Sequence, residues 1–223
     1  MKIFDEKLKR HIDLLVDRYP ALESSRQDII DAYLILEESY ENKGKLLIAG
    51  NGGSASDAEH IVGELMKAFV LPRPLDRDYR AALRSVDPEL GAVLCENLQA
   101  TLPAIALDGQ IALSTAFLND CEPLLCLAQQ VNGYGDSADV FLGITTSGNS
   151  RNILYAAVVA KAKGMKVIGL TGAKENKLMK YADVCIRVAQ TETYKVQELH
   201  LPVYHTLCIM LEDHFFGKSE PEE

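Results

Sequence analysis

The chain has 223 residues, of which 48% are hydrophobic, and its formal net charge at pH 7 is −9. This is enough apolar material for one sizeable core, and an acidic chain without a basic stretch is a poor partner for nucleic acid or acidic membrane surfaces. No apolar signal core or membrane-length apolar run is present. Five scattered cysteines without a CxxC pair suit reduced thiols, so we expect a cytoplasmic protein.

The first 42 residues have a helical pattern. Apolar residues recur there at helical spacing, and the pair Tyr19-Pro20 predicts a break into two helices, because the residue before a proline avoids helical angles. We interpret residues 1–42 as an N-terminal helical arm. It would cover one face of a sheet or form a subunit interface.

The period then changes to short apolar strands that alternate with helices. Strands are predicted at 45–50, 103–107, 140–144, 166–170 and 183–188. Helices are predicted at 54–68, 123–131, 152–163, 178–181 and 193–216. Such alternation favours an α/β three-layer sandwich with a central parallel sheet, here over residues 43–217, followed by an acidic tail at 218–223. We interpret residues 70–102 as a loop with one or two helical turns and a candidate lid.

Two loops rich in small residues follow predicted strands. The segment Thr145-Thr-Ser-Gly-Asn-Ser150 has four hydroxyls at a strand-to-helix junction, which favours a phosphate site over a simple helix cap by Ser150. The loop Gly50-Asn-Gly-Gly-Ser54 occupies a similar junction and is weak evidence alone. Neither loop matches a nucleotide-binding motif, and ligands of parallel sheets bind where such loops leave the strands. A small sugar phosphate is therefore the expected ligand.

Two helices carry titratable side chains at helical spacing. His60 and Glu64 are four residues apart, and Gln197 and His205 are eight residues apart on the last helix. The four side chains suit a zinc site, or acid–base catalysis by Glu64 and His205. The plainer alternative is a routine helix pair and a core histidine. Only the fold can bring the two helices together.

At this point the motifs resemble those of a known family. The quoted loops, His60-x-x-x-Glu64, Asn119-Asp120 and Gln197-Glu-x-His200-x-x-x-x-His205 resemble phosphoheptose isomerases, which are sedoheptulose 7-phosphate isomerases of the flavodoxin-like sugar-isomerase (SIS) fold. The resemblance covers roughly residues 30–215. It implies a homotetramer with active sites at subunit interfaces. The chain departs from the family pattern in residues 70–102, which are longer than usual, and between Asp108 and Asn119.

The resemblance also implies roles for individual residues. Glu64 would be the catalytic base and His205 its acid partner. Substrate would contact Asn51, Gly52, Gly53, Ser54, Glu64, Asn119, Asp120, Thr145, Thr146, Ser147, Ser150, Thr193 and Gln197. One zinc ion for each site would be held by His60, Glu64, Gln197 and His205.

The expected reaction is aldose–ketose isomerisation through an enediol, from sedoheptulose 7-phosphate to glycero-manno-heptose 7-phosphate. Two alternatives stay open. One is a non-catalytic SIS interaction protein, such as a tetramer that binds a bacterial replication initiator. Such a protein would have no chemical need for the four side chains His60, Glu64, Gln197 and His205. The other is an isomerase of a different ketose phosphate. A sugar-phosphate-sensing regulator is disfavoured, because no basic DNA-binding segment is evident.

Overall fold

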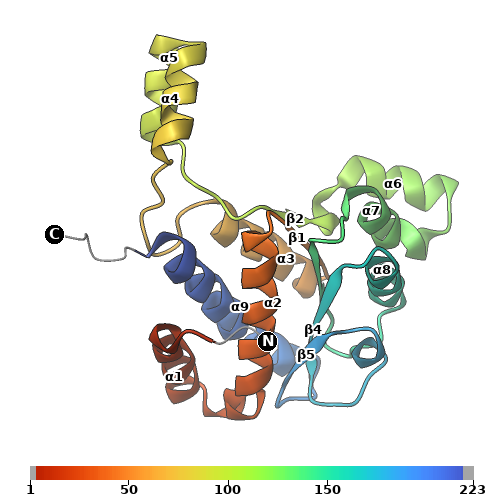
Figure 1. The fold of residues 1–223 in the computed structure, drawn as a ribbon. Coiled ribbons are helices and arrows are strands. Elements are labelled where there is room, and N and C mark those ends of the chain that lie inside the picture. Colours follow the sequence, from red (N-terminus) through yellow and green to blue (C-terminus); the bar gives the residue numbers. More distant parts are fainter. Residues whose placement is uncertain (1–3, 218–223) are drawn as a thin grey trace.

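The computed structural model describes residues 4–217, so the predicted acidic tail at 218–223 lies outside the described residues. Its centre is a sheet of five parallel strands in the order β2-β1-β3-β4-β5 (Figure 1). The strands are β1 (Leu46–Ala49), β2 (Ala104–Ala106), β3 (Val140–Ile144), β4 (Lys166–Gly172) and β5 (Val184–Val188). All five predicted strands are confirmed. The strand order reverses between β1 and β3, and ligands of parallel sheets bind at such a reversal.

Alternate side chains of β1, β3 and β4 enter two separate cores. Ile48 and Leu142 pack with one group of helices, whereas Leu47 and Phe141 pack with another. The first group is α1 (Lys9–Arg18), α2 (Arg26–Glu41), α3 (Gly53–Met66) and α9 (Thr193–Phe216), and the second is α7 (Cys126–Tyr134) and α8 (Arg151–Ala162). The predicted three-layer α/β sandwich is therefore confirmed.

The predicted N-terminal arm is part of the first core. A 3-10 helix, Pro20–Ser25, separates α1 from α2, which confirms the break at Tyr19-Pro20. Ile29 and Tyr33 of α2 are fully buried in the same cluster as the residues of α9. This region was predicted either to cover a face of the sheet or to form a subunit interface. In the single chain it covers a face of the sheet. Its division from the rest at residue 42 stays a prediction.

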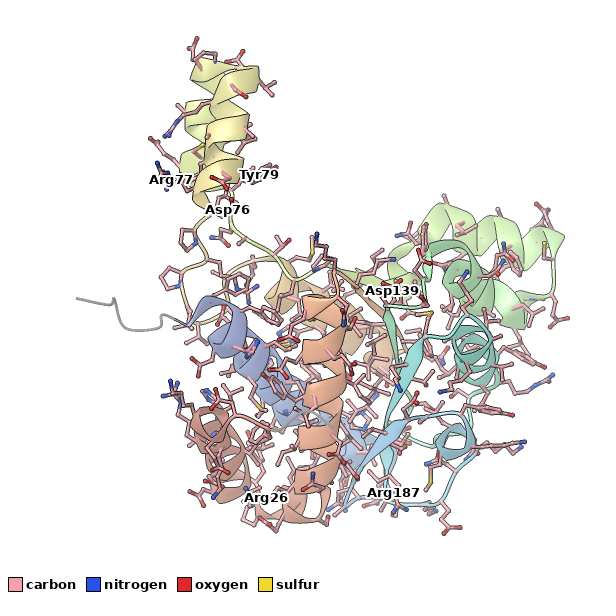
Figure 2. All side chains as sticks on the ribbon, viewed as in Figure 1. Arg26, Asp76, Arg77, Tyr79, Asp139 and Arg187 are labelled. Atoms are coloured by element: carbon pink, nitrogen blue, oxygen red, sulfur yellow. The ribbon has the colours of Figure 1, made fainter. Side chains whose placement is uncertain are left out.

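Residues 70–102 form more regular structure than predicted. Instead of a loop with a few helical turns, they contain a helical hairpin of α4 (Arg77–Val86) and α5 (Pro88–Asn97), which stands away from the sheet (Figure 1). Asp76 accepts a hydrogen bond from the Tyr79 N–H at the start of α4, near the base of the hairpin (Figure 2). Asp87 caps α5 in the same way and precedes a proline. These caps were the overlooked signal, because helices begin at such residues.

The helix α6 (Ile111–Asp120) was also not predicted. Most of its residues are exposed, including Ile111 and Leu118, so its apolar residues do not mark a single buried face. A helix without an apolar stripe facing the core gives no readable period. It follows a short 3-10 helix after β2 and packs mainly on α7 and the turn before it (Figure 1).

A buried ion pair anchors the base of the hairpin. The Arg73 guanidinium donates to Glu212 of α9 at 2.7 Å, and both side chains are 0% exposed. Arg73 also donates to the carbonyls of Glu64 and Leu65 near the end of α3, where helix carbonyls lack partners. The Glu212 carboxylate further accepts the backbone N–H groups of residues 69–71. The hairpin therefore starts from a rigid point next to α3 and α9.

No helix in the described part of the chain combines the length and the apolar character that crossing a membrane requires.

Candidate active site

The hydroxyl-rich loop joins β3 to α8 at the carboxyl edge of the sheet. Ser150 precedes α8, yet its hydroxyl pairs with the Thr145 hydroxyl at 2.9 Å and does not cap the helix. The simpler reading of this loop as an N-cap is therefore wrong for the Ser150 side chain. Backbone N–H groups at an uncapped helix start attract anions. A pocket of about 280 Å³ lies here, lined by Thr146, Ser147 and Thr193 among others.

One glycine gives this loop its shape. Gly148 has a φ of +66°, a left-handed conformation that other residues rarely adopt. A side chain there would also collide with Asn176, since an added Cβ would lie 2.0 Å from its Cγ. The tight turn thus requires glycine on two grounds, and it holds Thr146 and Ser147 at the pocket.

The glycine loop after β1 lies beside the hydroxyl loop. The side-chain amides of Asn51 and Asn152 exchange two hydrogen bonds, which joins the glycine loop to the first turn of α8. Gly52 precedes α3 with a φ of +58° and gives no side-chain cap, and the Ser54 and Ala55 N–H groups donate to the Asn51 and Gly52 carbonyls. The structure therefore brings the two predicted loops together, with Ser54 buried behind them.

A carboxylate that sequence reasoning missed supports this loop. Asp108 follows β2, and its Oδ2 accepts the Gly50 N–H at 2.9 Å. Burial, with a contribution from nearby Glu59, raises the pKa of Asp108 to about 6 despite that hydrogen bond. Its position directly after a strand was a signal that could have identified it.

The two helices that carry the predicted titratable side chains, α3 and α9, meet at His60. Its Nε2 lies 3.2 Å from Glu64 Oε1 on the same helix and 3.5 Å from His205 Nε2 on α9. Glu64 is 12% exposed, and Lys67 lies 3.2 Å from its other oxygen. Burial and the neighbouring His60 lower the pKa of His205, although Glu64 opposes them. The cluster therefore brings one carboxyl and two imidazole groups together around His60, and these are the group types that proton transfer uses.

Two further residues of this cluster were not predicted. Asp57 precedes His60 by three residues, and its Oδ1 accepts the Tyr204 hydroxyl at 3.2 Å. The same hydroxyl lies 3.1 Å from His60 Nδ1. Burial raises the pKa of Asp57 and that of Tyr204, the latter with help from the Asp57 charge. Helical spacing from His60 could have identified Asp57, whereas nothing in the sequence singles out Tyr204.

The other predicted residues of α9 lie nearer the phosphate pocket. Thr193 lines that pocket, and Gln197 packs so closely on Gly53 that an added Cβ would lie 2.5 Å from its Nε2. His205 follows eight residues later, about 12 Å along the helix axis. Gln197 therefore packs on the glycine loop, and its predicted role beside His60 stays a prediction. His200 is fully buried, and burial lowers its pKa to about 4.

Asn119 and Asp120 lie apart from these groups at the end of α6. Both are exposed, and the Asn119 amide donates to the Asp120 carboxylate at 2.8 Å. Within residues 4–217 no hydrogen bond joins this pair to any of the other predicted site residues. One chain alone thus assembles the two loops and the His60 cluster, and leaves this pair outside.

Comparison with known proteins agrees with the geometry. The SIS domain family model matches residues 80–172. The phosphoheptose isomerase of Aneurinibacillus thermoaerophilus is 36% identical over 80% of this chain and 77% of its own length. That of Thermodesulfovibrio yellowstonii is 37% identical over 82% and 78%. The structure of a phosphoheptose isomerase from Francisella tularensis aligns with a TM-score of 0.72 at 29% identity, covering 93% of this chain and 97% of that one.

The chain therefore belongs to the phosphoheptose isomerase family.

Proposed function

We propose that this protein isomerises sedoheptulose 7-phosphate to glycero-manno-heptose 7-phosphate through an enediol intermediate. The relatives named phosphoheptose isomerase support the substrate class. The observation that carries the chemistry is the meeting of Glu64 and His205 at His60, from helices that lie far apart in the sequence.

Different residues of the site carry out different parts of the proposed reaction. Glu64 removes the proton from the carbon next to the carbonyl, and His205 moves a proton at the neighbouring oxygen. The lowered pKa of His205 keeps this imidazole neutral near pH 7, so that it can accept a proton. Thr146, Ser147 and the open start of α8 bind the phosphate, and binding energy at that end positions the reacting carbons.

Zinc is the second part of the proposal. His60 Nε2 lies 3.2 Å from Glu64 Oε1 and 3.5 Å from His205 Nε2, although the ligand atoms of these three residues do not all lie within 4.8 Å of one another. Two imidazoles and a carboxylate are typical zinc ligands, so the donor set fits this metal. A bound ion would polarise the substrate oxygens as a Lewis acid. Gln197 is the fourth ligand that the family resemblance implies, although in the single chain it packs on Gly53.

We also propose that the protein acts in the cytoplasm as a homotetramer with sites at the subunit interfaces. The exposed pair Asn119 and Asp120 would reach substrate across such an interface. The exposed apolar residues of α6 and of the hairpin offer surface for subunit contacts. The five free cysteines suit a reducing compartment.

A direct assay tests the proposal. Purified protein is incubated with a panel of ketose phosphates, with and without a chelator, and the products are identified by NMR. We expect conversion of sedoheptulose 7-phosphate, loss of turnover with the chelator, and recovery when zinc is returned. Conversion of a different ketose phosphate, and not of sedoheptulose 7-phosphate, would assign the enzyme another substrate. No conversion of any sugar, by protein of verified fold and zinc content, would favour a binding role.

A further inference from the structure

A tyrosine hydroxyl connects the half-buried carboxylate of Asp57 to the central histidine of the candidate site. The Tyr204 hydroxyl lies 3.2 Å from Asp57 Oδ1 and 3.1 Å from His60 Nδ1. Asp57, His60 and Glu64 follow one another at spacings of three and four residues, so they share one face of α3. Tyr204 of α9 faces them and is buried, and its ring packs edge-on against His60.

The direction of these hydrogen bonds follows from the groups themselves. A phenol near neutral pH carries one hydrogen, and an ionised carboxylate can only accept. The Tyr204 hydrogen therefore goes to Asp57, and the hydroxyl oxygen is placed to accept from an N–H at His60 Nδ1. A neutral imidazole has a single N–H group, so His60 Nε2 keeps its electron pair. That nitrogen is the one that faces Glu64 Oε1 and His205 Nε2.

The free-energy cost of this arrangement indicates that Asp57 has a functional role. Asp57 Oδ2 is buried and has no hydrogen-bond partner within the described residues. A buried, unpartnered carboxylate oxygen destabilises a fold, and such groups call for a functional reason. Apart from the contact with Tyr204, the described chain supplies no hydrogen bond to the Asp57 side chain.

We infer that Asp57 and Tyr204 are positioning residues, which hold His60 as the tautomer protonated at Nδ1 and thereby present the Nε2 electron pair to a zinc ion shared with Glu64 and His205. The inference rests on the proposed function for the identity of the ion, and on geometry alone for the tautomer. Partners on the far nitrogen of a metal-binding histidine commonly fix its tautomer and orientation.

The variant Tyr204→Phe tests this by removing only the hydroxyl. Histidine tautomers are measured in metal-free protein at pH 8 by two-bond ¹H–¹⁵N correlation, and zinc affinity is measured by competition with a chelator. In the wild type we expect His60 to be protonated at Nδ1. In Tyr204→Phe we expect a mixture containing the other tautomer, and zinc affinity lower by about 10- to 100-fold.

Two further variants separate positioning from packing. Tyr33→Phe removes another buried phenol hydroxyl, which donates to Glu37 on α2, and it should leave the His60 tautomer and zinc affinity unchanged. Asp57→Asn keeps the shape of the carboxylate and removes its charge, and we expect it to reproduce the effect of Tyr204→Phe. Combining Asp57→Asn with Tyr204→Phe should add little, because the two residues act through one hydrogen-bond chain.

The possible failures are distinguishable. An unchanged tautomer in both Tyr204→Phe and Asp57→Asn, or a zinc affinity within twofold of wild type in both, would overturn the inference. Should Tyr204→Phe fail to fold by circular dichroism, the tautomer in Asp57→Asn decides the question. If wild-type protein binds no zinc but shows the Nδ1 tautomer, the metal part of the proposed function fails and the assignment of the tautomer stands.

Discussion

The pair α3 and α9 and the hairpin of α4 and α5 show two different ways in which helices pack in one chain. Between α3 and α9 the contact contains charged and polar groups, in which the hydroxyl of the buried Tyr204 joins Asp57 to His60. In the hairpin the apolar residues Val86 and Leu90 are 88% and 63% exposed. Burying polar groups costs free energy unless they are paired, whereas exposed apolar groups cost little to a single chain.

This difference indicates that catalysis and subunit assembly use separate regions of the molecule. The polar contact is expensive and specific, which suits an active site. The hairpin consists of two helices of ten residues each, too short to be stable alone in water, with an apolar surface left over. Such a surface suits contact with another subunit. Substitutions in the two regions should therefore differ in what they change.

The largest effect is expected at Glu64. Replacing it with glutamine keeps the shape of the side chain and removes the base, so kcat should fall by about two to four powers of ten, roughly 3–5 kcal/mol, while substrate still binds. Steady-state kinetics and a binding titration measure this. Glu89→Gln on the hairpin is the control and should leave kcat unchanged. Normal turnover by Glu64→Gln would remove this residue from the role of base.

Arg73→Met should cause the largest loss of stability. It leaves the Glu212 carboxylate buried without its cationic partner, which typically costs about 3–5 kcal/mol. Denaturant unfolding followed by circular dichroism measures the change. Arg84→Met is a matched control on the hairpin, because Arg84 is exposed and forms no ion pair within residues 4–217, and we expect a change below about 0.5 kcal/mol. Equal losses would contradict the contrast between the two regions.

The same ion pair predicts a dependence of stability on pH. Burial raises the pKa of Glu212, but the N–H groups of Phe69 and Val70 and the Arg73 guanidinium outweigh it, so the pKa is lowered. A carboxyl with a lowered pKa stabilises the fold fully above its unfolded value near 4.5, and this part is lost as the pH falls further. Unfolding free energies between pH 7 and pH 3 should fall less steeply for Glu212→Gln than for wild type. Parallel curves would show that Glu212 is not the group responsible.

A smaller effect is expected from Ser147→Ala. The variant removes one hydroxyl donor to the phosphate, and a hydrogen bond to a charged group contributes about 1.5–3 kcal/mol, roughly 10- to 150-fold in KM. Ser85→Ala on α4 removes a hydroxyl that bonds only the Ala82 carbonyl, and its KM should match wild type. An unchanged KM in Ser147→Ala would argue against this loop as the phosphate anchor.

The smallest effect is expected at Val86. Because the side chain is 88% exposed in the single chain, Val86→Ser should change the unfolding free energy of the subunit by less than about 0.5 kcal/mol. Denaturant unfolding at low protein concentration, together with light scattering, measures stability and mass. A loss of mass without a loss of subunit stability would show that the hairpin is covered in the assembled protein.

Local patterns in the sequence were sufficient for the sheet and for the two loops. Short apolar runs marked β1 to β5, because buried parallel strands are apolar along their whole length. The hairpin was missed because the caps of its helices went unrecognised, and α6 was missed because its exposed apolar residues follow no single face. The motif residues of the site could be named from the resemblance, but their arrangement in space could not.

What the sequence determined by itself is therefore the set of chemical groups, the strand-to-helix junctions at Gly50 and Thr145, and the spacing of His60 and Glu64 on one helix face. What only the tertiary structure decided is which groups meet. The packing of α3 against α9 places His205 beside His60, joins Tyr204 to Asp57, and sets Gln197 on the glycine loop. Residues 145 positions apart are brought together by burial of shared apolar surface, which local periodicity does not record.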